Sequence, residues 1–514
     1  MEVSNKEGVT PVGEQAYLAE EDGVVSKFGY KQELNRTLRF FSLFAVAFSV
    51  VSISTGLFLN YGFAINSFGP ASIWTWPIAA VGQIVMALII AELATKIPLA
   101  GYAYQWGGRL VGTAYGWFVA AFALVYMLVT VGAISLLGVA PLLFTAAGIN
   151  ESRGAVLAVA GVLLIAAIVI NLISVKFASR VNNLAVFAEI AGTMTLAIVL
   201  LILWGIHSGD ADRASLSILT NSTRTITGSG FYCFTLAGLI GIYTLVGFEL
   251  SADLSEEAVD SQKGVPRGII AGVAISAVLG MIALISFTLS ITNLKAAQES
   301  SQPLVTIAEA WLPTGVVRVF VFLVAFSMFA LVVITIAAAG RLVFSLSRDN
   351  LLPASRHLAT VDPKTKTPIK ALVTCGVIML ALMLYGYFQS DAFATLIGAT
   401  SLAPYVVYLL IVGAYIRGRP TLAEVEGGFN LGRWGPPLMV FGLVWIICAI
   451  LVLAIPSQFH GADKIVVGGG VVAAVWYFLV LRGRIAKGTA GVNRYRAGSE
   501  EARAVESMRG TTPG

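Results

Sequence analysis

The stretch FFSLFAVAFSVVSISTGLFLNYGF at residues 40–63 decides the fold of this chain, because it is a membrane-length apolar segment with a polar interruption. The interruption reads VSISTG at residues 51–56. A second interruption, YTLVGFE at residues 243–249, lies in the apolar run that begins at Phe231. Breaking a helix in lipid frees backbone groups that need partners, so such segments survive only inside protein or beside a cavity. A matched pair of them indicates the binding site of a secondary transporter.

The composition excludes a soluble protein. The 514 residues are 57% hydrophobic and 12% charged, and the mean hydropathy is +0.84, whereas soluble domains carry about 25% charged residues. Apolar runs long enough to cross a bilayer recur along the chain. We therefore expect an all-α membrane protein with twelve transmembrane helices, at residues 39–63, 70–94, 114–140, 154–175, 184–206, 231–252, 268–291, 315–344, 369–388, 392–416, 436–456 and 464–481.

The distribution of basic residues predicts the orientation. Alternate connections, counted from the one at 95–113, hold 15 Lys and Arg residues, whereas the other connections hold 6. By the positive-inside rule, the tails at 1–38 and 482–514 are both cytoplasmic, in a multi-pass protein of the plasma membrane. The net charge of +5 follows from this topology. The expected partner is therefore the lipid bilayer, and no nucleic acid is expected.

The sequence contains no ATP-binding motif that could drive transport and no metal or haem site that could catalyse a reaction. It lacks any Gly-Lys dipeptide, so a phosphate-binding loop for ATP is absent. Its only histidines, His207, His357 and His460, fall in predicted loops, which excludes a haem or histidine-built metal site in the membrane. We expect no cofactor, no metal and no enzyme activity. Transport would be driven by a gradient, or would be passive as in a channel.

Three carboxylates fall in predicted spans, where ionisable groups are costly and therefore candidates for function. Glu92 precedes Lys96 by four residues, which favours a helix-end ion pair. Glu189 lies inside the fifth span. Because burial favours the neutral form of a carboxyl group, a buried Glu can bind and release a proton, and we predict Glu189 as the proton-coupling residue. The alternative is a protonated Glu that is hydrogen-bonded to a neighbouring helix.

Glu249 lies at the second interruption, where it could bind a substrate ammonium or hold unwound backbone together. The N-terminus of a half-helix attracts anionic groups, so a substrate with a carboxylate and an ammonium would bridge the two interruptions. The acidic residues after Glu249 are expected to form salt bridges with Lys263, Arg267 or other basic residues at that end. The predicted substrate-binding residues are Ser52, Ser54, Thr55, Gly56, Tyr243, Gly247, Phe248 and Glu249.

From about residue 28 to residue 480 the chain resembles the amino acid/choline transporter family, within the amino acid–polyamine–organocation superfamily. The resemblance rests on short motifs that occur in order and at membrane-consistent spacing. They are GYKQELNR (29–36), STGLF (54–58), GP (69–70), AEL (91–93), PLAGYAYQW (98–106), GFE (247–249), PRGI (266–269) and RLVFSLSRDNLLP (341–353).

The resemblance implies an inverted repeat of five plus five helices, 39–206 and 231–416, with two further helices at 436–481. The interruptions then fall in the first span of each repeat, and alternating access occurs around them. Some proton-coupled relatives carry Lys where this chain has Glu189. Sodium-coupled relatives use adjacent hydroxyls on the eighth span, whereas Ser327 and Thr335 are far apart here. Proton coupling is therefore favoured over sodium coupling.

The expected function is import of a small, γ-aminobutyrate-like amino acid by proton symport. The alternatives are a permease for choline, ethanolamine or a polyamine, and an amino acid exchanger. A quaternary ammonium is best held by an aromatic cage. The two interruptions supply Tyr243 and Phe248 but no Trp, which favours an amino acid.

Overall fold

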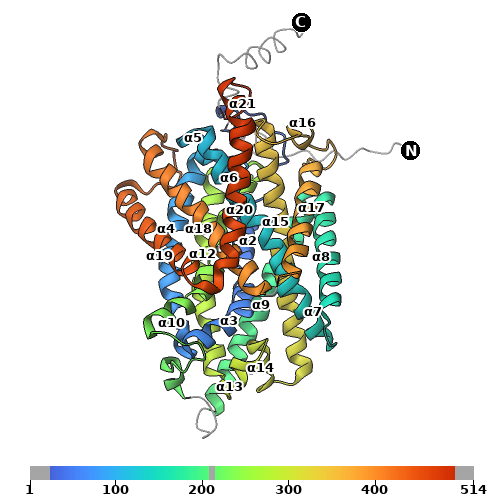
Figure 1. The fold of residues 1–514 in the computed structure, drawn as a ribbon, viewed down its shortest axis with the longest axis vertical. Helices are drawn as coiled ribbons and strands as arrows, with labels where there is room; N and C mark the ends of the chain where they lie inside the picture. The colour runs from blue at the N-terminus through green and yellow to red at the C-terminus, as the bar shows by residue number, and fades with distance from the viewer. Residues whose placement is uncertain (1–23, 208–214, 390, 493–514) are drawn as a thin grey trace, which may run out of the picture.

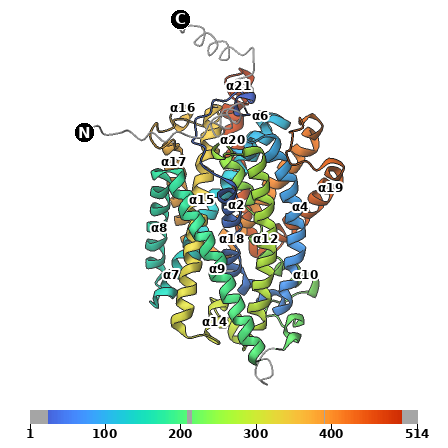
Figure 2. The same ribbon diagram turned by 180° about the vertical axis from the view of Figure 1, so that it is seen from behind.

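The computed structural model of the chain describes residues 24–207, 215–389 and 391–492. These residues form twelve helical segments that are long and apolar enough to cross a membrane. The segments run side by side along one axis of the molecule (Figures 1 and 2). The described residues contain no strand, only an isolated bridge between Leu38 and Ala258. The prediction of an all-α protein with twelve spans is confirmed.

The first and sixth spans are broken, and the other ten are continuous or nearly so. Spans 1 to 6 are α2 (Phe40–Val51) with α3 (Ile53–Phe68), η1 (Pro70–Trp74) with α4 (Thr75–Lys96), α6 (Thr113–Ile134) with η2 (Ser135–Val139) and α7 (Ala140–Ala147), α8 (Arg153–Ile173), α9 (Val175–His207), and α10 (Gly230–Ala237) with α11 (Leu239–Thr244) and η4 (Phe248–Glu257).

Spans 7 to 12 complete the bundle. They are α12 (Ser261–Leu289), α15 (Thr314–Arg348), α17 (Ile369–Tyr387), α18 (Ala392–Gly418), α19 (Gly435–Ala454), and α20 (His460–Trp476) with η8 (Tyr477–Leu481) and α21 (Arg482–Ala486). The longer connections form short helices, α5 (Tyr102–Leu110), α13 (Leu294–Glu299), α14 (Pro303–Glu309) and α16 (Ser355–Leu358). The structure differs most from the predicted spans at α9. This helix begins nine residues before the predicted start at residue 184, because the polar residues before that position are also helical.

The two ends of the bundle differ. Residues 24–38 and 482–492 lie at one end, the upper one in Figure 1, which we call the terminal end. The loops with α10, α13 and α14 lie at the opposite end. The predicted tails, 1–38 and 482–514, fall partly outside the described residues. The division into two five-helix repeats stays a prediction.

The broken spans lie in the interior of the bundle. The first, second, sixth and tenth spans are the most deeply buried, whereas the fourth, eleventh and twelfth are the least buried. The exposed residues of the outer spans include many Val, Ile, Leu and Phe side chains. An apolar outer surface of this kind is suited to lipid, since lipid replaces water around it. The interruptions are therefore surrounded by protein, which can satisfy their backbone groups.

Candidate functional site

The first break is one residue wide. Helix α2 ends at Val51, and Ser52 adopts a left-handed conformation with φ 35° and ψ 89° before α3 begins. The Ser52 N–H donates to the Phe48 carbonyl at 2.8 Å, and its Oγ accepts from the Thr55 N–H at 3.3 Å. A left-handed conformation is unfavourable for a residue with a Cβ, and these two hydrogen bonds stabilise it. The break therefore leaves the N-terminus of α3 pointing into the protein interior.

The second break surrounds Gly247, which has φ 91°. A Cβ at this position would overlap the side chain of Val50 on the first broken span, so both the backbone conformation and the close approach require glycine. The Gly247 N–H donates to the Tyr408 hydroxyl at 3.3 Å. From Phe248 the chain continues as η4, a 3₁₀ helix. The two broken spans are thus in direct contact.

Gly56 makes a second close contact between the two breaks. A Cβ built on Gly56 would overlap the Oγ1, Cγ2 and Cβ atoms of Thr244, the last residue of α11. The Thr244 hydroxyl, whose oxygen is the atom nearest to Gly56, donates to the Ile240 carbonyl. The absence of a side chain at Gly56 therefore lets α3 lie against α11.

Substituting Gly56 with alanine is expected to reduce transport at least about tenfold, because overpacking by one methyl group costs about 1–3 kcal/mol and would separate the two breaks. The reciprocal change Thr244→Gly in the same protein should restore part of the activity, since it removes the overlapping atoms. Initial uptake rates at equal membrane expression measure both effects. Unchanged uptake by Gly56→Ala would show that the contact has no role.

Glu189 on α9 binds the first break. Its Oε1 atom accepts a hydrogen bond from the Ser54 N–H at 2.9 Å and another from the Ser52 hydroxyl at 3.1 Å. The carboxylate therefore lies at the N-terminus of α3, where the helix dipole favours a negative charge. Glu189 is 2% exposed, and within the described ranges it forms no ion pair. A separate hydrogen bond of 2.7 Å joins the Ser54 and Thr193 hydroxyls beside it.

Glu249 lies at the second break, two residues after Gly247. Its Oε2 accepts from the Tyr408 hydroxyl at 2.6 Å, while its buried Oε1 has no hydrogen-bond partner among the described residues. Phe248 stacks on Tyr408 with ring centroids 5.9 Å apart and an interplanar angle of 26°. Tyr408 on α18 thus supports the whole second break. The sequence did not identify Tyr408, because no motif or interruption marks it.

A small cavity lies between the breaks. Its volume is about 20 Å³, enough for roughly one water molecule and too small for an amino acid. Of the eight predicted substrate-binding residues, only Thr55 and Tyr243 line it. The others lie nearby, with Ser52 and Ser54 against Glu189, Gly56 against Thr244, and Gly247, Phe248 and Glu249 against Tyr408. The lining residues are Val50, Val51, Thr55, Tyr126, Thr130, Ile134, Tyr243, Val246, Leu331 and Thr400.

Sequence reasoning missed three polar side chains of this cavity. Tyr126 and Thr130 come from α6 and Thr400 from α18. Both helices are uninterrupted at these positions, so nothing in the sequence distinguishes these residues from other hydroxyls in spans. The Tyr243 hydroxyl has no hydrogen-bond partner in the described structure. The cavity therefore presents hydroxyl groups that a polar ligand could engage once the breaks separate.

Three other buried carboxylates, Glu92, Glu256 and Glu257, form ion pairs. Glu92 pairs with Lys96 at 2.8 Å, as predicted, and also contacts Tyr415 and Arg419. Glu257 pairs with Arg341 at 2.8 Å. Of the four acidic residues after Glu249, Glu256 and Glu257 form the predicted salt bridges, whereas Asp253 accepts from the Gly101 N–H and Asp260 from the Lys263 N–H. The basic partners in these salt bridges come from α15 rather than from Lys263 or Arg267.

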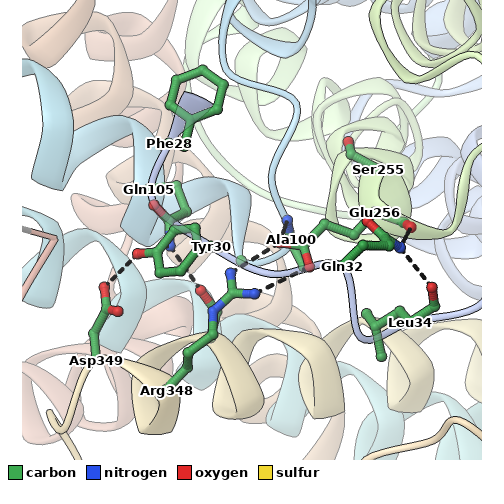
Figure 3. Close-up of polar contacts among 12 residues, drawn as sticks. Phe28, Tyr30, Gln32, Leu34, Ala100, Gln105, Ser255, Glu256, Arg348 and Asp349 are labelled. Carbon is green, nitrogen blue, oxygen red and sulfur yellow. Dashed lines mark hydrogen bonds and ion pairs between the residues drawn. The ribbon is translucent and has the colours of Figure 1, made fainter. Parts of the chain in front are cut away.

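A polar network closes the terminal end (Figure 3). The Arg348 guanidinium donates to both oxygens of Glu256, at 2.9 and 3.1 Å, and lies 3.8 Å from the centroid of the Tyr30 ring. The Tyr30 hydroxyl donates to Asp349 at 2.8 Å, and the Gln32 amide donates to the Glu256 carbonyl at 2.7 Å. We call these five residues the terminal-end network. It joins the segment before the first span to α15 and η4.

Asp349 also receives hydrogen bonds from other elements. Its carboxylate accepts from the Tyr104 hydroxyl at 2.6 Å, and its carbonyl accepts from the Gly491 N–H at 2.9 Å. Burial raises the pKa of Asp349, while Arg348 and the two tyrosine hydroxyls oppose the increase. Protonation is therefore easier in this closed arrangement than in water, so falling pH favours the closed arrangement over one that exposes Asp349.

Comparison with known proteins identifies the family. A family profile described as "Amino acid permease" matches residues 38–480. The chain belongs to the amino acid permease family. The predicted membership of the amino acid–polyamine–organocation superfamily is thereby confirmed, and this permease is a transporter of amino acids rather than an enzyme.

Relatives with known names match the permease over most of their length. It is 25% identical over 474 residues to the amino-acid permease BAT1 of Arabidopsis thaliana, covering 85% of this chain and 88% of that protein. It is 26% identical over 510 residues to the GABA-specific permease of Saccharomyces cerevisiae, covering 91% and 86%. It is also 23% identical over 542 residues to the thiamine transporter thi9 of Schizosaccharomyces pombe, covering 95% and 89%.

Proposed function

We propose that this permease imports a small amino acid across the plasma membrane by proton symport, with Glu189 as the proton-coupling residue. The observation that carries the proposal is the contact of the buried Glu189 carboxylate with the Ser54 N–H and the Ser52 hydroxyl. A proton on Glu189 weakens its attraction to the positive N-terminus of α3. Proton binding can therefore change the first break, which is where the substrate binds in this proposal.

The proposed substrate site is formed by the two breaks. A substrate carboxylate would approach the N-terminus of α3, and an ammonium would approach Glu249. The hydroxyls of Thr55 and Tyr243, which line the cavity, would bind the polar groups between them. The match to a GABA-specific permease supports a small substrate with separated charges.

Alternating access is supported by the closed state of the site. The cavity of about 20 Å³ holds no amino acid, and the terminal-end network blocks one end of the bundle. The excess of basic residues in the connections at the terminal end supports a cytoplasmic position for this end. Release of substrate to the cytoplasm would therefore require the network to open and the two breaks to separate.

Replacing Glu249 with glutamine is expected to weaken binding of an amino acid about tenfold or more, because a charge-assisted hydrogen bond to an ammonium contributes about 1.5–3 kcal/mol. Glutamine can still accept from the Tyr408 hydroxyl through its carbonyl oxygen, so the second break should keep its structure. The dissociation constant from radioligand binding measures the effect. Equal affinity in the variant and the wild type would assign Glu249 a structural role only.

Uptake by proteoliposomes tests the proposal. The purified permease would be supplied with labelled γ-aminobutyrate, alanine, glutamate, lysine, choline and ethanolamine in sodium-free buffer, with and without an inward proton gradient. We expect one or more of the amino acids to accumulate only with the gradient. Uptake that needs sodium, or that occurs only against internal substrate, would contradict proton symport and favour sodium coupling or exchange.

A second candidate substrate is a cationic amine. Two tyrosines, Tyr126 and Tyr243, line the cavity, and aromatic faces bind organic cations. The similarity to a transporter named for thiamine, which is itself a cation, also favours a cationic substrate. The same uptake panel separates the two candidates, since choline or ethanolamine would then accumulate in preference to the amino acids.

A further inference from the structure

Two hydroxyl groups connect Glu189 to the cavity between the breaks. The Ser52 hydroxyl donates to Glu189 Oε1 at 3.1 Å. A hydrogen bond of 2.6 Å then joins Ser52 Oγ to Thr55 Oγ1. Thr55 lines the cavity, whereas Ser52 and Glu189 do not. All three side chains are at most 2% exposed, so these contacts are shielded from bulk water.

The single hydrogen of each hydroxyl fixes the direction of these bonds. A hydroxyl donates once and can accept twice. With Glu189 ionised, Ser52 uses its hydrogen for the carboxylate, so the Thr55 hydroxyl must donate to Ser52. Thr55 then offers only oxygen lone pairs to the cavity. In this state the cavity wall at Thr55 is suited to a hydrogen-bond donor and repels a carboxylate.

Protonation of Glu189 reverses the direction. The new O–H of Glu189 donates to Ser52 Oγ, and Ser52 then donates to Thr55 Oγ1. The Thr55 hydroxyl is released and can donate into the cavity. The proton stays on Glu189 and no O–H bond breaks, because the two hydroxyls only rotate. In this state the cavity wall at Thr55 is suited to the carboxylate of a substrate.

We propose that the Ser52–Thr55 hydroxyl pair transmits the protonation state of Glu189 to the cavity, so that the substrate carboxylate binds after the proton. This inference rests on the proposed role of Glu189 in proton coupling and adds a route and a binding order to it. It also selects for substrates with a carboxylate, because a cation such as choline gains nothing from a donor at Thr55. Ser52 and Thr55 are thus positioning residues that link the two ligands.

Charged groups on the helices around α9 have other partners or lie elsewhere. Helix α9 packs against α2, α8, α12 and α15. On α15, Arg341 is paired with Glu257 and Arg348 with Glu256, and Arg318 lies in the first two turns of the helix. Lys263 and Arg267 lie in the first turns of α12, Arg153 is the first residue of α8, and α2 carries no charged residue. On α9 itself, Lys176 and Arg180 lie more than two turns before Glu189. Among the described residues, the polar contacts of Glu189 are therefore those with the first break.

The test is the pH dependence of substrate affinity in three variants. Thr55→Val keeps the shape of the side chain and removes its hydroxyl. Ser52→Gly removes the other hydroxyl and suits the left-handed conformation of this residue. Thr193→Val is the matched control, because it removes a hydroxyl of the neighbouring Ser54–Thr193 hydrogen bond, which does not reach the cavity. Binding of the labelled substrate found in the uptake panel would be measured on purified protein from acidic to alkaline pH.

We expect the wild type and Thr193→Val to bind the substrate at least about fivefold more tightly at acidic than at alkaline pH. A factor of about five is at the lower end of the coupling usually found between two ligands. Thr55→Val and Ser52→Gly should bind with the same affinity at every pH. A normal pH dependence in either variant would overturn the hydroxyl route while leaving proton symport intact. Affinity without pH dependence in the wild type would also overturn it, and the uptake experiment would then decide separately whether protons drive transport.

Discussion

The Glu189→Gln variant is expected to lose proton-driven accumulation and to keep substrate exchange. Glutamine can accept from the Ser54 N–H through its carbonyl oxygen and donate to the Ser52 Oγ through its amide, as protonated Glu189 does, so the first break should remain intact and able to bind substrate. It cannot gain or lose a proton at neutral pH, so the variant has no means of linking substrate to the gradient. For one coupled proton, a one-unit pH gradient supports about tenfold accumulation, and this factor should disappear.

The comparison uses two assays on the same proteoliposomes. Accumulation of labelled substrate under an inward pH gradient reports coupling, and counterflow against internal substrate reports folding and alternating access. Counterflow near the wild-type rate with no accumulation is the expected result. Normal accumulation by Glu189→Gln would show that another group carries the proton.

The second large effect is expected from Glu256→Gln at the terminal end. The substitution keeps the size of the side chain and leaves Arg348 as a nearly buried cation without its carboxylate partner. Removing one member of a buried ion pair typically costs 3–5 kcal/mol. Because the Glu256–Arg348 ion pair forms only in the closed arrangement, its loss destabilises the closed arrangement and not the open one. The population open at the terminal end should rise by roughly a hundredfold or more.

A cysteine placed at Ser345 measures this shift. Ser345 is buried and accepts from Gln105, which also donates to the Tyr30 hydroxyl. In a background without the three native cysteines, alkylation of Ser345→Cys should become much faster when Glu256→Gln is added. Glu299→Gln is the matched control, because its pair with Lys295 is exposed and should contribute little. Equal alkylation rates in all three proteins would show that the network does not hold the end closed.

Hydropathy and local interruptions were sufficient to predict the spans and both breaks. A span is a local property of the sequence, since about 20 apolar residues are needed to cross the bilayer. The polar clusters at 51–56 and 243–249 mark the breaks for the same reason. Glu189 could be identified because an ionisable carboxyl group within a span is energetically unfavourable and therefore indicates a functional role.

The partners of these groups could not be predicted, because they depend on how distant helices pack. Glu189 bonds to Ser54 across 135 positions, and Glu249 bonds to Tyr408 across 159. The terminal-end network joins Tyr30 to Asp349 across 319 positions. Hydroxyl side chains such as those of Thr130 and Thr400 are common within apolar helices, so only the packing shows which of them reach the cavity.

The most direct test of proton symport is the internal pH of proteoliposomes on addition of substrate. A pH-sensitive dye would be enclosed in vesicles that contain the permease, with equal pH on both sides, sodium-free buffer, and potassium with valinomycin to hold the membrane potential. An inward gradient of an amino acid substrate should acidify the interior, and Glu189→Gln should abolish this acidification. Substrate entry by the wild type at constant internal pH would contradict the account.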